Sequence, residues 1–169
     1  MQETKTLEAG GHATRVLDVG SGTPVVVLHG WGGRLESMAP VVECLRSGFR
    51  VIALDLPGFG DSPVPAGAWG TPDYATYVRD VLAEMDVSRA HFVGHSFGAK
   101  VSFYLSATVP ALVDKLILMG SPGLRTPPSL KARAKRAASK SARVAGKLGT
   151  PGRALRDRVY RAVASQDYQ

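Results

Sequence analysis

The most reactive group that the sequence offers is the hydroxyl of Ser96, in the motif Gly-His-Ser-Phe-Gly at residues 94–98. An apolar run, Ala90–Val93, precedes the motif, and a run typical of a helix follows it. A nucleophile elbow requires this strand–turn–helix setting, because the turn lifts the serine hydroxyl clear of the sheet. Gly94 and Gly98 remove the side chains that would collide in so tight a turn. The motif predicts a nucleophilic serine, against the plainer alternative of an ordinary glycine-rich turn.

A serine nucleophile also needs hydrogen-bond donors for the oxyanion that it creates. Residues 29–33, His-Gly-Trp-Gly-Gly, follow the apolar run Val25–Leu28, which is typical of a strand. Such a loop can bring a backbone N–H close to the serine, and the residue after the serine, Phe97, supplies a second one at a helix N-terminus. The alternative is a simple strand-to-helix turn. We expect His29 to support this loop rather than to act as the base.

The elements that must position these groups alternate along the chain. Continuous apolar runs predict buried parallel strands, and amphipathic stretches between them predict helices. The segment His12–Asp18 alternates more weakly and predicts an antiparallel edge strand. We therefore expect an α/β fold, with a mostly parallel sheet and helices on both faces. The predicted strands are 25–28, 50–54, 90–93 and 115–119, and the predicted helices are 35–47, 71–85, with Thr71 as N-cap, and 97–109.

A third motif, Asp-Leu-Pro-Gly-Phe-Gly-Asp-Ser at residues 55–62, lies between the other two. In this order and spacing, the three motifs resemble the α/β-hydrolase superfamily, over residues 12–124. The closest similarity is to its cap-bearing branch of serine esterases, lipases and carbon–carbon-bond hydrolases. The resemblance implies Ser96 as catalytic nucleophile and the backbone N–H groups of Trp31 and Phe97 as the oxyanion hole. It also implies a supporting set of residues: His29, Gly30, Gly32, Asp55, Gly94 and Gly98.

The resemblance further implies acyl-enzyme chemistry on a small carboxylic ester or related acyl substrate. Relatives that form an alkyl-enzyme ester carry Asp where this chain has Ser96. Asp55 matches a position that organises a loop beside the site and is not the triad acid. We expect Trp31, Phe97 and Leu124 to line an apolar substrate site.

The sequence departs from this family in its histidines. The triad order is serine, then acid, then histidine, whereas His12, His29, His91 and His95 all precede Ser96. We expect His95 to pack beneath the elbow. The chain therefore resembles the N-terminal portion of a longer hydrolase, truncated before the last two strands, and we expect little activity from it alone. The alternative function is a catalytically silent fragment that acts as a binding or assembly module.

Charge divides the chain in two. Residues 1–124 carry 9 Lys and Arg against 12 Asp and Glu, a net charge of −3, whereas residues 125–169 carry 12 against 2, a net charge of +10. We expect residues 1–124 to form the hydrolase core and 125–169 to form a partial basic helical cap. The basic segment could attract an acidic partner. The alternative is that these charges form the solvated face of cap helices. Few aromatic residues interleave with these charges, so no specific nucleic acid is predicted.

The remaining expectations concern setting and partners. Cys44 is the only cysteine, which excludes an intrachain disulfide and a cysteine metal cluster. We expect no cofactor and no metal, no transmembrane segment, and a cytoplasmic protein. The predicted strand 115–119 has few charges of its own, so self-association through an exposed sheet edge is a further possibility.

Overall fold

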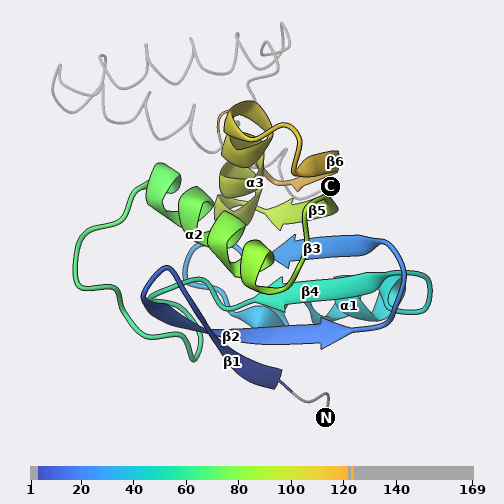
Figure 1. Cartoon of the computed structure of the whole chain (residues 1–169), viewed down its shortest axis with the longest axis horizontal. Coiled ribbons are helices and arrows are strands. Elements are labelled where there is room, and N and C mark those ends of the chain that lie inside the picture. The colour runs from blue at the N-terminus through green and yellow to red at the C-terminus, as the bar shows by residue number, and fades with distance from the viewer. Residues whose placement is uncertain (1–3, 122, 124–169) are drawn as a thin grey trace, which may run out of the picture. The chain divides into compact units, whose positions relative to one another are not determined.

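The computed structural model describes residues 4–121 and Gly123. Within this part, six strands form one sheet in the order β1-β2-β4-β3-β5-β6 (Figure 1). Strands β4, β3, β5 and β6 run parallel, and β2 pairs antiparallel with both β4 and β1. This confirms the predicted α/β fold with a mostly parallel sheet. The strands are β1 (Thr4–Ala9), β2 (His12–Val19), β3 (Pro24–Leu28), β4 (Arg50–Leu54), β5 (Ala90–His95) and β6 (Val113–Met119).

Helices cover both faces of the sheet, as predicted. Helices α2 (Thr71–Glu84) and α3 (Phe97–Thr108) lie in front of it in Figure 1, and α1 (Ala39–Leu45) lies behind. Alternate side chains of β3 enter two separate cores. Val26 and Leu28 pack with α2 and α3, whereas Val25 and Val27 pack with α1 and the short 3-10 helix η1 (Leu35–Met38). A strand covered on both faces needs an unbroken apolar run, which is why β3 reads Val-Val-Val-Leu.

The first strand was not predicted, and it changes the place of β2 in the sheet. Strand β1 pairs with β2 along its whole length, so β2 is not the edge strand that its weak alternation suggested. The two strands are joined at Gly10 and Gly11, whose φ angles are 54° and 76°. A Gly-Gly pair at positive φ fits a tight two-residue hairpin, and this turn was the signal that the prediction overlooked.

Two predicted helices begin differently from expectation. The helix predicted over 35–47 is η1 followed by α1. Pro40 has no N–H to donate to the carbonyl of Glu36, which instead accepts a 3-10 hydrogen bond from Ala39. Helix α2 has Gly70 rather than Thr71 as its N-cap, and the Gly70 N–H donates to the Asp73 carboxylate at 2.7 Å.

Strand β6 is the outermost strand of the described sheet beside β5. Its last residues are apolar on both faces, as in a strand covered on both sides, yet Ile117 is 56% exposed and Met119 is 39% exposed. Apolar side chains on an outer strand favour pairing with another chain. The edge on which the predicted self-association depends is thus present in the described part of the molecule.

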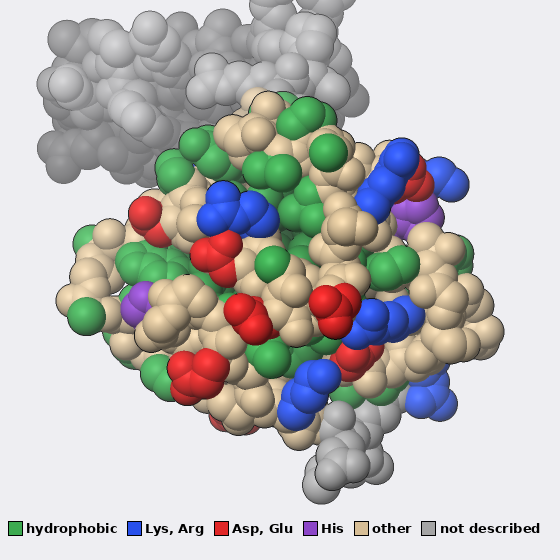
Figure 2. Space-filling model, viewed as in Figure 1, with side chains coloured by type: hydrophobic (Ala, Val, Ile, Leu, Met, Phe, Trp, Pro, Cys, Tyr) green, Lys and Arg blue, Asp and Glu red, His purple; other side chains and the backbone are tan. Residues whose placement is uncertain are grey.

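The described surface carries charges of both signs. Acidic and basic side chains are interspersed on the face shown in Figure 2. Several charged residues of the described part form ion pairs, such as Arg50 with Asp18 at 2.9 Å. By its internal contacts the chain divides into residues 1–124 and 125–169. The predicted basic helical cap lies outside the described residues. Among the described helices, none is long and apolar enough to cross a membrane.

Candidate active site

Ser96 occupies a sharp turn between β5 and α3. Its φ and ψ angles are 49° and −105°, a backbone conformation that residues other than glycine rarely adopt and that costs free energy. The turn is fixed on both sides by hydrogen bonds. The Ser96 N–H donates to the carbonyl of Met119 in β6 at 2.8 Å, and the Ser96 carbonyl accepts from Lys100 in α3 at 3.1 Å. The strained serine is therefore held by the sheet on one side and by the helix on the other.

The two glycines of the motif allow the helix to approach the sheet closely. A Cβ atom on Gly94 would lie 2.5 Å from the backbone nitrogen of Ala99, and one on Gly98 would overlap the carbonyl of Leu28. The Gly98 N–H donates to the carbonyl of His29 at 3.0 Å. The first turn of α3 is therefore packed directly against the end of β3, where any larger residue would push it away.

The loop predicted to hold the oxyanion lies against this turn. A Cβ atom on Gly30 would lie 3.3 Å from the Cβ atom of Ser96 and 2.9 Å from Nδ1 of His95. The loop closes on itself through the Gly33 N–H, which donates to the Gly30 carbonyl at 2.9 Å, and Gly32 adopts a φ of 68° within it. Residues 29–33 and the serine turn, which are far apart in the sequence, thus form one structural unit.

His29 is fully buried, and both of its ring nitrogens are used. The backbone N–H of Leu56 lies 3.0 Å from Nε2, which must accept because an N–H can only donate. Nδ1 therefore carries the proton and donates to the Gly30 carbonyl at 2.8 Å. Burial lowers the pKa of His29, so the neutral ring that this arrangement needs is favoured. His29 is thus engaged with the loop and not with the Ser96 hydroxyl.

This arrangement also orients the peptide unit that joins Gly30 to Trp31. Its carbonyl is held by two donors, the His29 ring and the Gly33 N–H. In a trans peptide the N–H points away from the carbonyl, so the Trp31 N–H faces away from both donors. Phe97 is the first residue of α3, where the N–H has no partner within the helix. Within the described residues, neither amide donates a backbone hydrogen bond.

Asp55 follows β4 and is fully buried, and both of its carboxylate oxygens are engaged in structural contacts. One oxygen accepts from the Leu35 N–H at 2.5 Å, and the other accepts from the Asp61 N–H at 2.9 Å and lies 3.4 Å from the Arg15 guanidinium. A Cβ atom on Gly60 would overlap this carboxylate, so the loop can close around Asp55 only with glycine there. Asp55 ties the loop at 55–62 to the start of η1 and makes no contact with Ser96.

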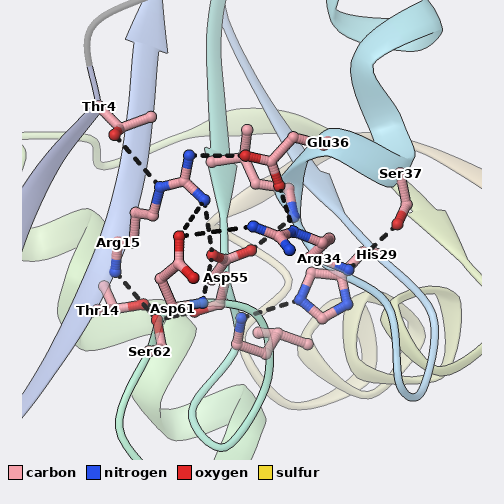
Figure 3. Close-up of polar contacts among 12 residues, drawn as sticks. Thr4, Thr14, Arg15, His29, Arg34, Glu36, Ser37, Asp55, Asp61 and Ser62 are labelled. Carbon is pink, nitrogen blue, oxygen red and sulfur yellow. Dashed lines mark hydrogen bonds and ion pairs between the residues drawn. The ribbon is translucent and has the colours of Figure 1, made fainter.

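Arg15 of β2 extends this contact into a network of charges that the sequence did not predict (Figure 3). Its guanidinium donates to Asp61 at 2.7 Å and to Glu36 at 2.6 Å, and Arg34 donates to Glu36 at 2.7 Å. Hydrogen bonds from Arg15 and then Arg34 lower the pKa of Glu36 to about 2. The network joins β2, η1 and the loop at 55–62, segments whose proximity only the folded sheet reveals.

The other histidines differ in their surroundings. His95 is exposed rather than packed beneath the elbow, because the residues against its ring, Gly30 and Gly120, have no side chains to cover it. His12 is half-buried against Trp69 and Tyr77. Nδ1 of His91 lies 3.1 Å from a carboxylate oxygen of Asp114, without hydrogen-bond geometry. Within residues 4–121, none of these histidines is hydrogen-bonded to the Ser96 hydroxyl, and no group of three His, Cys, Asp or Glu is placed to hold a metal ion.

Comparison with known proteins places this geometry in a family. A sequence profile described as the alpha/beta hydrolase fold matches residues 23–151, which include all three motifs. The chain belongs to the α/β-hydrolase family. The family assignment accounts for the parallel sheet, the helices on both faces and the strained turn after β5.

Several members of the α/β-hydrolase family are similar to this chain. The 2-hydroxy-6-oxo-2,4-heptadienoate hydrolase of Pseudomonas putida F1 is 36% identical over 120 residues, 69% of this chain and 44% of that protein. A soluble epoxide hydrolase from Corynebacterium sp. C12 is 34% identical over 115 residues, 68% of this chain and 40% of that protein. The crystal structure of a hydrolase from Pseudomonas aeruginosa PA01 has a TM-score of 0.68 at 26% identity, covering 95% of this chain and 65% of that one. The chain thus spans less than half the length of the two curated relatives named here.

Proposed function

We propose that this chain carries the nucleophile and oxyanion-binding part of a serine hydrolase that acts on a carboxylic ester or a related acyl substrate. The observation that carries the proposal is the strained turn at Ser96, whose φ is 49°, backed directly by the loop at 29–33. Strain of this kind persists only where the surrounding structure enforces it, and it is often found at functional sites. Ligands of open parallel sheets also bind beyond the carboxyl ends of the strands, where Ser96 lies.

The chemistry would proceed by acyl transfer. Ser96 Oγ attacks the substrate carbonyl carbon while a general base takes the hydroxyl proton, and the carbonyl π electrons move onto oxygen. The N–H groups of Trp31 and Phe97 donate to that oxyanion, and the N-terminus of α3 adds a favourable dipole. Collapse expels the leaving group, which takes a proton, and water then releases the acyl group from Ser96.

The base is the part of this mechanism that the described residues do not supply. His29 uses both ring nitrogens in the loop, and both oxygens of the Asp55 carboxylate accept hydrogen bonds from loop N–H groups. We infer that the base comes from residues beyond 4–121 or from a second polypeptide. The relatives named above include an epoxide hydrolase and a dienoate hydrolase, which supports hydrolysis in general. The narrower assignment to acyl chemistry rests on serine at position 96.

Covalent labelling with an alkyl fluorophosphonate tests this proposal. Ser96 Oγ would form a bond to phosphorus as the phosphorus–fluorine bond breaks, fluoride leaves and the proton passes to the base or to buffer. When the base is supplied, we expect one label per chain, mapped to Ser96 by mass spectrometry and lost in Ser96→Ala. The matched control is Ser106→Ala, which removes another hydroxyl of α3 that bonds within the helix and should leave labelling unchanged.

A different result would favour the alternative function. A folded chain that acquires no label even when the rest of a longer hydrolase is added, or that labels equally in Ser96→Ala, would contradict an acyl-transfer site. The catalytically silent module would then be the better account. A label that forms only when the rest of a longer hydrolase is added would support the proposal and locate the missing base.

A further inference from the structure

Four aromatic residues beside Ser96 form a cluster that the proposed chemistry does not use. We call Trp31, Phe59, Tyr74 and Phe97 the aromatic corner. The Trp31 ring stands almost perpendicular to two others, at 86° to Phe97 with centroids 5.2 Å apart and at 73° to Phe59 with centroids 4.9 Å apart. Tyr74 supports Phe97 from α2, with centroids 5.0 Å apart and an angle of 89°. Trp31 and Phe97 are also the two residues whose N–H groups are proposed to bind the oxyanion.

The base of the corner is rigid. Phe97 is fixed by the first turn of α3, and Tyr74 is buried in α2 with its hydroxyl donating to the carbonyl of Pro57 at 3.1 Å. The Phe59 N–H donates to the Leu56 carbonyl at 2.9 Å, in the loop held by Asp55. Phe59 and Phe97 are partly buried against the core that the sheet forms with α2 and α3. Their positions therefore need little adjustment when a ligand arrives.

Trp31, in contrast, is 69% exposed, although it is the largest side chain of the corner. It rests on the two rings below it and leaves most of its surface in water. Exposing so much apolar surface costs free energy that burial against a ligand would recover. Two rings at right angles offer a third flat ring one face to stack on and one edge to meet, the arrangements that aromatic pairs prefer.

We propose that the aromatic corner makes the site selective for acyl groups that are flat and conjugated or aromatic, over saturated ones of the same size. This inference rests on the proposed function, because the corner selects an acyl group only if Ser96 receives it. The flat group would lie against Trp31 and Phe97 with its carbonyl carbon at Ser96 and its carbonyl oxygen at the two amides. A saturated ring has no flat face and would bury a similar area without the aromatic contacts.

A pair of carboxylates with nine carbons each isolates flatness as the variable. Trans-cinnamate is flat and conjugated, and 3-cyclohexylpropanoate is its saturated counterpart. We would measure the dissociation constant of each with the 169-residue Ser96→Ala protein by isothermal titration calorimetry. Where Trp31 is retained, its indole N–H signal would also be followed by NMR, with Trp69→Phe assigning the two tryptophan signals. We expect cinnamate to bind about tenfold more tightly, the size of effect that one or two aromatic contacts produce.

Substitutions assign the preference to the corner. In Trp31→Ala the ratio of the two dissociation constants should fall to about one, whereas Trp31→Leu, which keeps an apolar side chain, should retain binding of both ligands without the preference. The matched control is Val64→Ala, an apolar residue that is 82% exposed and belongs to no ring contact, and its ratio should stay at about ten. Because Trp31 is exposed, its removal should leave the fold intact.

Three outcomes would overturn the inference: equal affinity for the two ligands, no binding of either, or a preference that persists in Trp31→Ala. These failures differ from failure of the proposed function. If Ser96 takes up the fluorophosphonate but the preference is absent, only the inferred selectivity for flat acyl groups is wrong. If the preference is present but Ser96 takes up no label even when the rest of a longer hydrolase is added, the corner binds flat ligands and the acyl-transfer proposal is wrong.

Discussion

His29, Asp55 and Ser96 lie at the carboxyl ends of three neighbouring parallel strands, β3, β4 and β5, yet they differ in what surrounds their side chains. His29 and Asp55 are fully buried, and each uses its polar atoms on backbone N–H or carbonyl groups of the loops. Ser96 is only partly buried, and its backbone rather than its hydroxyl makes the contacts that fix it.

This difference shows that residue types alone do not identify a triad. Histidine, aspartate and serine gather at one end of the sheet, but the first two are structural. Their contacts hold the loop at 29–33 and the loop at 55–62, which in turn surround the serine turn. If the distinction is right, removing His29 or Asp55 should change stability, whereas removing the Ser96 hydroxyl should change chemistry alone.

The largest expected effect comes from Asp55. Replacing it with Ala leaves the Leu35 and Asp61 N–H groups without their acceptor and Arg15 without its buried partner. We expect a loss of about 3–5 kcal/mol in the free energy of unfolding, measured by urea denaturation. The control is Asp61→Ala, whose exposed carboxylate should be worth less than about 1 kcal/mol. Equal losses in the two variants would show that Asp55 is not the structural centre of this loop.

The next largest loss of stability is expected from disturbing the close packing of the serine turn. Gly98→Ala places a methyl group on the carbonyl of Leu28, so the start of α3 must move. We expect a loss of about 2–4 kcal/mol in unfolding free energy, with reduced labelling of Ser96. Gly67→Ala adds the same methyl group where nothing lies within 4 Å and serves as the control. A Gly98→Ala protein as stable as the control would contradict the geometry of the turn.

A smaller effect concerns the protonation of His29. Burial lowers its pKa in the folded protein, so below the ordinary value of 6.5 the unfolded chain binds more protons than the folded one. We expect stability to fall as the pH is lowered through this window, with a slope of at most about 1.4 kcal/mol per pH unit from this residue. His29→Gln should flatten the slope. An unchanged slope in that variant would show that His29 is not the group being titrated.

The smallest effect belongs to the exposed part of the charge network. Arg15 and Arg34 lower the pKa of Glu36 to about 2, so its contribution is present above the ordinary value of 4.5 and is lost as the pH falls toward 2. Because the carboxylate is half exposed, Glu36→Gln should cost well under about 1 kcal/mol at neutral pH. NMR titration of the Glu36 carboxyl should find the low midpoint, and a midpoint near 4.5 would mean that the network does not form in solution.

The sequence predicted the parts of the molecule that depend on local pattern. The apolar runs located β3, β4 and β5 because strands covered on both faces have little polar alternation. The run at 115–119 located β6 in the same way, although β6 is largely exposed in the described structure. The glycine spacing around Ser96 located the turn, because only glycine permits such close approach. Strand β1 was missed because its side chains are largely exposed and its pattern is weak.

Interactions between distant segments could not be predicted in the same way. The residues around Arg15 in the sequence do not indicate that it forms ion pairs with Asp61 and Glu36. The proximity of these three residues depends on the order of strands in the sheet. His95 was expected to pack beneath the turn, but it is exposed. Its exposure depends on Gly30 and Gly120, which lie against its ring and belong to segments distant in the sequence. The sequence indicated that His29 would support its loop, but not that its ring would accept a hydrogen bond from the Leu56 N–H, which follows the neighbouring strand β4.

The most direct test of the central claim is a crystal structure of the protein labelled with an alkyl fluorophosphonate. The account predicts phosphorus bonded to Ser96 Oγ, with the phosphoryl oxygen about 2.7–3.1 Å from the backbone nitrogens of Trp31 and Phe97. A phosphoryl oxygen that points to solvent and meets neither amide would contradict the account, as would a label on any other residue.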